Sequence, residues 1–111
     1  MAETETKAVV TITDDNFEQI LNSGKPLFID FWAVWCGPCR LVGPIVEDLA
    51  PNYDGRAVIG KLDVDNNPRV AQQFGVTSIP TMIMFKGGKQ VDRMVGAAPK
   101  GVLQTFIDRN L

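Results

Sequence analysis

The stretch Trp35-Cys36-Gly37-Pro38-Cys39 contains both cysteines of this 111-residue chain and marks a boundary between two kinds of sequence pattern. The residues before it form an apolar run typical of a buried strand, and those after it have the spacing of an amphipathic helix. Cys36 is therefore predicted at a helix N-terminus, where unpaired backbone N–H groups and the helix dipole favour a thiolate. Cys39 follows one turn later on the same face, within bonding reach. We interpret the pair as a reversible dithiol–disulfide switch.

Two other interpretations of the cysteine pair remain open, namely a structural disulfide and a pair of inert thiols. A disulfide across so short a loop constrains the unfolded chain little, because the entropy that it removes grows with loop length. This disfavours a purely structural bridge.

The composition is that of one ordinary globular domain, with 45% apolar and 22% charged residues. A chain of 111 residues can build one core but not two, so we expect a single domain over residues 1–111, with residues 1–7 as a polar N-terminal extension. The net charge of −2 and the absence of a long apolar run predict neither nucleic acid nor a membrane as a partner.

The chain contains no histidine, which excludes Ser-His-Asp and Cys-His catalytic groups and imidazole ligands for zinc or haem. With two cysteines alone, a four-ligand zinc site would need carboxylates or a second chain. We therefore expect no metal and no other cofactor.

The first seven residues are polar and lack the apolar stretch of a secretion signal, so we expect a cytoplasmic protein. An organellar protein whose leader has been removed would have the same sequence. We also expect a monomer, because no apolar stripe away from the cysteines requires a partner.

Apolar spacing and turn residues predict the element order βαβαβαββα. In the first half, strands are expected at residues 9–12 and 27–31, separated by a helix that Thr13 caps. The second helix is expected to run from Cys36 to about Tyr53 and to bend at Pro44, whose ring removes an N–H. Its buried face should carry Leu41, Val42, Ile45, Val46 and Leu49.

In the second half, a strand is expected over residues 57–64, and a helix begins at Asn66-Asn67-Pro68. Strands at residues 81–85 and 90–95 flank Lys86-Gly87-Gly88-Lys89, which is a clear hairpin signal. Strands separated by helices should run parallel, and the hairpin should add an antiparallel edge. The last helix should bury Val102, Leu103, Phe106 and Ile107.

Three motifs in this order resemble the thioredoxin family: Asp30-Phe31-Trp32-Ala33 before the cysteines, then Ser78-Ile79-Pro80-Thr81, then Val95-Gly96-Ala97. The resemblance extends from about Val9 to Leu111, and the predicted element order agrees with it. It implies an α/β fold in which a mixed five-stranded sheet carries helices on both faces. Val34, Arg40 and Gly43 depart from the family pattern. Gly43 weakens the helix before Pro44. Val34 and Arg40 flank the cysteines, which affects target preference and redox tuning rather than the chemistry.

The order of the two cysteines assigns their roles. Cys36 is expected to be the exposed nucleophile with a low pKa, whose thiolate forms a mixed disulfide with a target protein. Cys39, deeper and less accessible, is the resolving thiol. Gly37 leaves room for the target, and Pro38 stiffens the link between the two sulfurs.

Asp30 lies in an apolar strand, and loss of hydration there should raise the pKa of its carboxyl. The residues alone leave open that this side chain turns to solvent at a strand edge. The resemblance makes Asp30 the buried acid below the sulfur of Cys39, and we expect it to accept the Cys39 proton. By the same resemblance, Lys61 modulates the charge of Asp30.

Pro80 precedes a strand, so the residues alone are compatible with an ordinary trans proline. The resemblance implies a cis Ile79–Pro80 bond beside the sulfurs, which would expose the Ile79 backbone to a target. Trp32 is either core filling or a direct contact. An uncharged docking surface is expected from Trp35, Gly37, Pro38, Ile79, Pro80, Gly96 and Ala97.

Three classes of function share these features. The leading one is a general protein disulfide reductase that acts on diverse disulfide-containing proteins and is re-reduced by a flavoprotein or ferredoxin-linked thioredoxin reductase. An oxidase or isomerase has the same fold, but the resemblance implies a histidine between the cysteines of such proteins. A binding module would use the same surface without turnover.

Overall fold

The structure is a computed structural model that describes residues 8–111; residues 1–7, the predicted polar extension, lie outside the described residues. Its strands are β1 (Val9–Thr11), β2 (Leu27–Trp32), β3 (Val58–Asp63), β4 (Thr81–Lys86) and β5 (Lys89–Val95). Its α-helices are α1 (Phe17–Leu21), α2 (Cys39–Leu49), α3 (Pro68–Gln73) and α4 (Lys100–Asp108), and the 3₁₀-helix η2 (Ala50–Tyr53) continues α2. The predicted order of strands and α-helices is confirmed.

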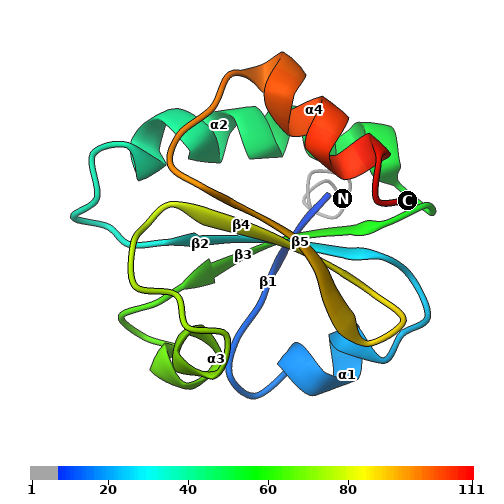
Figure 1. Cartoon of the computed structure of the whole chain (residues 1–111), viewed down its shortest axis with the longest axis horizontal. Coiled ribbons are helices and arrows are strands. Elements are labelled where there is room, and N and C mark those ends of the chain that lie inside the picture. The colour runs from blue at the N-terminus through cyan, green and yellow to red at the C-terminus, as the bar shows by residue number, and fades with distance from the viewer. Residues whose placement is uncertain (1–7) are drawn as a thin grey trace, which may run out of the picture.

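Within residues 8–111, the five strands form one mixed sheet in the order β1-β3-β2-β4-β5. Helices α2 and α4 cover one face of this sheet, and α1 and α3 cover the other (Figure 1). This is the α/β arrangement that the resemblance implied. No helix in this part of the chain combines the length and the apolar character needed to cross a membrane.

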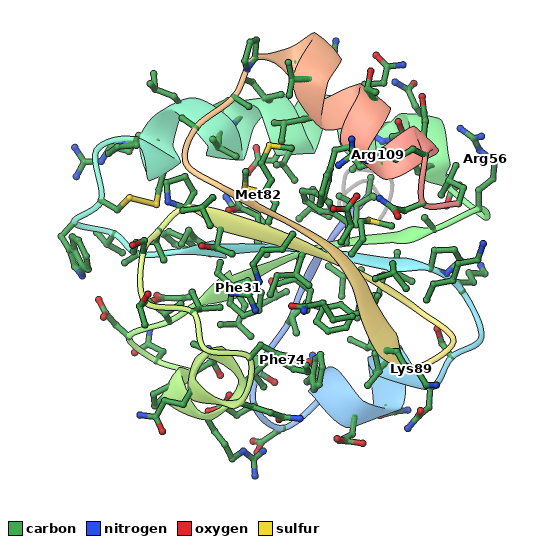
Figure 2. All side chains as sticks on the ribbon, viewed as in Figure 1. Phe31, Arg56, Phe74, Met82, Lys89 and Arg109 are labelled. Carbon is green, nitrogen blue, oxygen red and sulfur yellow. A yellow bond between two sulfur atoms is a disulfide. The ribbon has the colours of Figure 1, made fainter. Side chains whose placement is uncertain are left out.

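The central strand β2 is buried on both faces, as its nearly continuous apolar sequence predicts. Phe28 packs in the layer under α2 and α4 together with Met82. Phe31 packs in the opposite layer with residues of α1 and α3. Figure 2 shows Met82 on one side of the sheet and Phe31 and Phe74 on the other. The strand that leads to the cysteines is therefore held rigidly between two apolar layers.

Strand β4 runs antiparallel to β2, so the prediction that strands separated by helices run parallel is wrong here. A parallel strand can begin only after the chain has returned along the full length of the sheet. The six residues of α3 span about 9 Å, whereas the six residues of β2 span about 20 Å. The chain therefore enters β4 at the end where β2 finishes, and Thr81 pairs with Phe31. This brings Pro80 to the same end of the sheet as the cysteines.

Helix α2 begins at Cys39 rather than Cys36, because Pro38 is its N-cap, a position where a missing N–H has no cost. The α-helix ends at Leu49, and the last turn to Tyr53 is 3₁₀. Pro51 in that turn lacks the N–H that would continue the α-helical ladder. The observed α-helix is therefore shorter at both ends than the predicted one.

The buried stripe of α2 is narrower than expected. Val42, Val46 and Leu49 are buried, but Leu41 is 67% exposed, because it lies one residue, or about 100°, around the helix from the stripe. Val102 of α4 is likewise 48% exposed, whereas its neighbour Leu103 is fully buried. Both expectations of burial were wrong.

Two turns show how local sequence sets the elements. Asn16, not Thr13, is the N-cap of α1, and Thr13 instead closes the preceding turn. Its Oγ1 accepts a hydrogen bond from the Asn16 N–H, while Asn16 Oδ1 accepts one from the Thr13 N–H. Between β4 and β5, Gly87 and Gly88 have φ values of 64° and 78°, which confirms the predicted two-residue hairpin turn.

Candidate active site

Cys36 and Cys39 form a disulfide at the junction of β2 and α2, with their Cα atoms 5.3 Å apart. Cys36 lies in the loop, and Cys39 is the first residue of the helix. The backbone N–H of Cys39 donates a hydrogen bond to Sγ of Cys36 over 3.2 Å. A backbone N–H in this position, at the start of a helix, favours negative charge on the sulfur that it faces.

Both cysteines are nearly inaccessible in this oxidised state, at 3% exposure for Cys36 and 4% for Cys39. The expectation of an exposed Cys36 and a deeper Cys39 is therefore wrong for the disulfide form. Ala33 and Ile79 pack against the pair, and Sγ of Cys36 lies 3.7 Å from the carbonyl oxygen of Ile79. The disulfide turns the Cys36 sulfur towards this neighbouring segment rather than towards solvent.

Three loops meet at the disulfide. The Ile79–Pro80 bond is cis, as the resemblance implied, and Ile79 contacts Cys36. The N–H of Gly96 donates to the carbonyl oxygen of Pro80 over 2.8 Å, which joins the third loop to the second. Gly96 has a φ of 96°, a conformation that glycine adopts without steric cost.

The expected docking residues differ in exposure. Trp35 is 67% exposed, and Gly37, Pro38 and Ala97 are also exposed. Of the remaining docking residues, Ile79 and Gly96 are half-buried and Pro80 is buried. Pro80 therefore offers no exposed side chain, contrary to the expectation that it forms part of the surface.

A contact that the sequence does not predict fixes the exposed indole of Trp35. Its Nε1–H donates to Oδ2 of Asp65, in the loop between β3 and α3, over 2.8 Å. Asp65 is separated from Trp35 by 30 residues, so no local sequence signal predicts this contact. Nearby, Arg40 Nη2 donates to the carbonyl oxygen of Val34 over 3.0 Å, tying the first turn of α2 to the loop before Cys36.

Asp30 is fully buried, so the open alternative of a solvent-facing carboxylate is wrong. Neither of its carboxylate oxygens has a hydrogen-bond partner among residues 8–111. Burial raises the pKa of this carboxyl from 3.8 to about 7, and the positive charge of Lys61 partly opposes that rise. Asp30 is thus a buried carboxyl that titrates near neutral pH.

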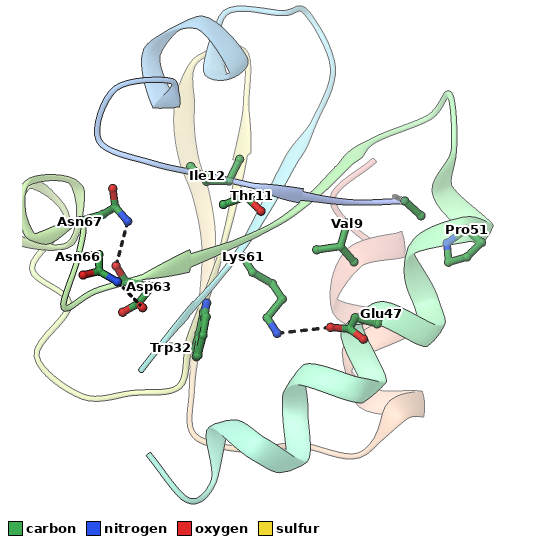
Figure 3. A pocket seen from close by; sticks show the side chains of 11 residues that line it. Val9, Thr11, Ile12, Trp32, Glu47, Pro51, Lys61, Asp63, Asn66 and Asn67 are labelled. Atoms are coloured by element: carbon green, nitrogen blue, oxygen red, sulfur yellow. Dashed lines mark hydrogen bonds and ion pairs between the residues drawn. The ribbon is translucent and has the colours of Figure 1, made fainter. Parts of the chain in front are cut away.

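Lys61 pairs with Asp30 in the register of β3 and β2. Its Nζ lies 3.7 Å from Glu47 Oε2 and 4.9 Å from the centre of the Trp32 ring. Figure 3 shows these three side chains in a groove of about 720 Å³ between α2 and the β1–β3 edge of the sheet. Trp32 is half-buried and serves as a cation–π platform, a role that the sequence analysis did not foresee.

A second cavity, of about 300 Å³, reaches Cys39. Its walls include Trp32, Cys39, Gly43 and Lys61. Among the described residues, no group of three or more His, Cys, Asp or Glu side chains is placed to hold a metal ion. The site therefore combines a disulfide, a buried acid and a neighbouring ammonium group.

A helix-terminal disulfide beside a cis proline, at the end of a mixed α/β sheet, defines a dithiol–disulfide oxidoreductase. The sequence model of the thioredoxin family matches residues 8–109. The chain belongs to the thioredoxin family of protein disulfide oxidoreductases, and Cys36 and Cys39 are its redox-active pair.

Curated relatives agree with this assignment. Thioredoxin 2 of Chlorobaculum tepidum is 54% identical over 100 residues, which cover 89% of this chain and 92% of that protein. The thioredoxin of Staphylococcus haemolyticus is 52% identical, with 94% of this chain and 99% of the relative covered. Thioredoxin 1 of a Nostoc species is 47% identical, with coverages of 94% and 98%.

Proposed function

We propose that this protein is a general protein disulfide reductase that is re-reduced by a thioredoxin reductase. The observation that carries the proposal is the hydrogen bond from the Cys39 N–H to Sγ of Cys36, which supplies the stabilisation that a nucleophilic thiolate needs. The names of the curated relatives support it as well.

The reaction transfers two electrons to the target in two exchanges. The Cys36 thiolate attacks one sulfur of the target disulfide, so that a Cys36–target bond forms and the second target sulfur leaves as a thiolate. Cys39 then loses its proton and attacks Sγ of Cys36, and the first target sulfur leaves. The target ends as a dithiol, and the protein ends with the Cys36–Cys39 disulfide seen in the structure.

Asp30 accepts the proton of Cys39 in the second exchange, and Lys61 adjusts the charge of the Asp30 carboxyl. Three observations support this: the carboxylate is buried without a hydrogen-bond partner among the described residues, its pKa is about 7, and its register partner Lys61 lines the same cavity as Cys39. A base whose pKa lies near the working pH is well matched to this proton transfer.

The Asp30 role is tested by the rate at which a preformed mixed disulfide resolves. In Asp30→Asn this rate should be lower and should lose its midpoint near pH 7, because no carboxylate is left to ionise. A resolution rate that stays equal to that of the parent protein from pH 6 to 9 would exclude the role.

Targets dock on the uncharged surface formed by Trp35, Gly37, Pro38, Ile79, Gly96 and Ala97. Apolar contact and pairing with the Ile79 backbone demand no particular target sequence, which suits a general reductase. We also infer that the protein works in the cytoplasm, where proteins are kept in the dithiol state. Either a flavoprotein or a ferredoxin-linked thioredoxin reductase could supply its electrons.

Two cysteine variants separate a reductase from a binding module. Cys36→Ser should abolish the catalysis of insulin reduction by dithiothreitol. A pure binding module would keep its binding activity in this variant. Cys39→Ser should accumulate a mixed disulfide with the target, because the resolving thiol is gone. If both variants catalysed insulin reduction like the parent protein, disulfide exchange by this pair would be excluded.

The direction of electron flow is tested by the reduction potential. A reductase should have a reduction potential of about −270 mV, the established value for thioredoxin, whereas strong oxidants of this fold have potentials of about −120 mV. A measured value close to the oxidants would reverse the proposed direction.

A further inference from the structure

The loop of residues 75–80, which carries the Ile79 backbone to the disulfide, begins where α3 ends. Phe74 is the C-cap of α3, and Gly75 follows it with a φ of 63°. The N–H groups of the first two loop residues donate to carbonyl oxygens in the last turn of α3 over 3.1 Å and 2.9 Å, which is a common way for a helix to close at a glycine. These two bonds do not use the carbonyl oxygen of Phe74, so that oxygen can accept a hydrogen bond from another element.

The donor to this oxygen is Arg93 of β5, whose Nη2 binds the carbonyl oxygen of Phe74. Arg93 pairs with Ile83 in the register of β5 and β4, and Ile83 is buried in the apolar layer on the side of α1 and α3. Because paired residues project from the same face of a sheet, the arginine side chain leaves β5 towards α3. Its Nε and Nη2 also donate to Oε1 of Gln90 over 3.2 Å and 2.8 Å, so its own strand fixes the guanidinium group.

The other end of the loop is attached to the residue that follows β5. The N–H of Gly96 donates to the carbonyl oxygen of Pro80 over 2.8 Å. Residues 75–80 are therefore bonded at both ends to one short stretch of chain. Between the two attachments, the carbonyl oxygen of Ile79 lies 3.7 Å from Sγ of Cys36. The strand β5 thus sets where the loop stands relative to the disulfide.

Helix α3 has other anchors besides Arg93. The ring of Phe74 packs edge-on against Phe17 and Phe85, with ring centres 5.6 Å and 5.0 Å apart (Figure 2). At the start of the helix, the carboxylate of Asp14 accepts hydrogen bonds from two backbone N–H groups of the first turn. The arginine bond instead fixes the peptide group from which the loop departs. Its loss should therefore loosen the loop without unfolding the helix.

We propose that Arg93 is a positioning residue for protein targets, because its hydrogen bond to Phe74 keeps residues 75–80 in the position that docks a target. This inference rests on the proposed function, in which targets pair with the Ile79 backbone. Arg93 acts through the loop and not on the sulfurs. A loop released at one end occupies the docking position for a smaller fraction of the time, and the apparent affinity for the target falls by that fraction.

The test compares Arg93→Met, which removes the donors but keeps a long side chain, with Arg56→Met. Arg56 is the matched control, because its guanidinium group also donates to a backbone carbonyl oxygen, that of Asn52, over 2.8 Å. Each reduced protein is mixed with insulin and, separately, with a small aromatic disulfide that needs no docking loop. In Arg93→Met the second-order rate constant with insulin should fall about fivefold, as for the loss of one net hydrogen bond. The rate constant with the small disulfide should stay nearly constant, and Arg56→Met should change neither.

Three further measurements separate positioning from a general loss of stability. In Arg93→Met, amide hydrogen exchange should become faster in residues 75–79 and remain at the parent rate in α4. Arg93→Lys should recover part of the insulin rate, because an ammonium group can still donate to the carbonyl oxygen of Phe74. Gly60→Ala, where a new Cβ atom collides with the buried Ile12, is destabilised elsewhere and should keep the parent ratio of the two rate constants.

An Arg93→Met protein with the parent ratio of the two rate constants would overturn the proposal. So would a ratio in Gly60→Ala that falls as far as in Arg93→Met, because stability would then explain the effect. Faster exchange in residues 75–79 with an unchanged insulin rate would overturn it too, since a looser loop would not affect docking.

The same experiments distinguish failure of this inference from failure of the proposed function. If Cys36→Ser lost the catalysis of insulin reduction while Arg93→Met reacted like the parent protein, only the inference about Arg93 would fail. If the reduced parent protein reacted with insulin no faster than dithiothreitol does, the reductase function would be excluded, and the docking role of Arg93 with it.

Discussion

Asp30 and Lys61 occupy the same register position on the neighbouring parallel strands β2 and β3, so their side chains leave the same face of the sheet. Asp30 is fully buried, whereas the Lys61 side chain remains 20% exposed. Burial raises the pKa of Asp30, the lysine lowers it, and the balance lies at about 7. Strand pairing alone thus places a titrating carboxyl beside a cation, and both lie at the end of the sheet that carries the disulfide.

Replacing Asp30 with asparagine should remove a pH dependence of stability. The carboxyl has a pKa of about 7 in the folded protein and 3.8 ordinarily, so between these values the folded state keeps a proton that the unfolded chain releases. The free energy of unfolding of the parent should therefore fall as pH rises from about 4 to 7, by up to roughly 4 kcal/mol, and then level off. Asp30→Asn should lack this fall and be more stable than the parent at pH 8.

Urea denaturation of the oxidised proteins at pH 5, 7 and 9 measures the effect of Asp30→Asn. The difference in stability between variant and parent should grow from pH 5 to 7 and then remain constant. Two stability curves that stay parallel over this range would contradict the raised pKa of Asp30.

Lys61→Met should raise the pKa of Asp30 further, because the substitution removes the positive charge that lowers it. A rise of roughly one unit is expected for a charge on the adjacent strand. NMR titration of the Asp30 carboxyl carbon measures it. Lys100→Met is the control, since this exposed lysine pairs with Asp48 on the surface of α2. If the Asp30 pKa were identical in the Lys61→Met and Lys100→Met variants, Lys61 on β3 would have no such influence.

Trp35→Ala should weaken docking of protein targets without weakening the fold. The indole is 67% exposed, so stability should change by less than about 0.5 kcal/mol. KM for a protein disulfide such as insulin should rise about tenfold, as for loss of one aromatic contact residue, while the rate with a small aromatic disulfide should stay nearly constant. Trp35→Phe retains the ring but loses the hydrogen bond to Asp65, so it should have an intermediate effect. An equal loss with both substrates would indicate a role in the chemistry instead.

Gly60→Ala should destabilise the protein through a steric clash in the centre of β3. A Cβ atom there would lie 2.5 Å from Cγ1 and 2.8 Å from Cδ1 of Ile12, and 3.2 Å from the carbonyl oxygen of Val10. Ile12 is fully buried and cannot move aside, so a cost of about 1–3 kcal/mol is expected in urea denaturation.

Two comparisons give the Gly60 prediction its control. Gly101→Ala, which meets no neighbouring atom, should cost nothing comparable. Adding Ile12→Val to Gly60→Ala should recover part of the loss, because valine lacks the Cδ1 atom. No recovery would mean that the clash with Ile12 is not the cause.

Features that depend on a few neighbouring residues could be predicted from the sequence. Gly87 and Gly88 supply the positive φ values of the hairpin, and proline at the first position of α3 marks the start of that helix. The apolar run of β2 predicted a strand covered on both faces. The spacing of Cys36 and Cys39 predicted their bond, because residues three apart at a helix start are neighbours in any fold.

Features that depend on contacts between distant segments required the tertiary structure. The direction of β4, the burial of Cys36 under Ile79, and the hydrogen bond from Trp35 to Asp65 all join segments 30 or more residues apart. Local spacing carries no information on which of these segments meet, because many packings satisfy the same apolar pattern.

The sequence by itself determined the order of the elements and the redox pair, since backbone periodicity and turn chemistry act over a few residues. Only the tertiary structure decided that Lys61 lies against Gly43, Glu47 and Trp32 beside a buried Asp30. The physical reason is that a charge in a protein responds to what surrounds it in space, and these surroundings come from β2, β3 and α2 together.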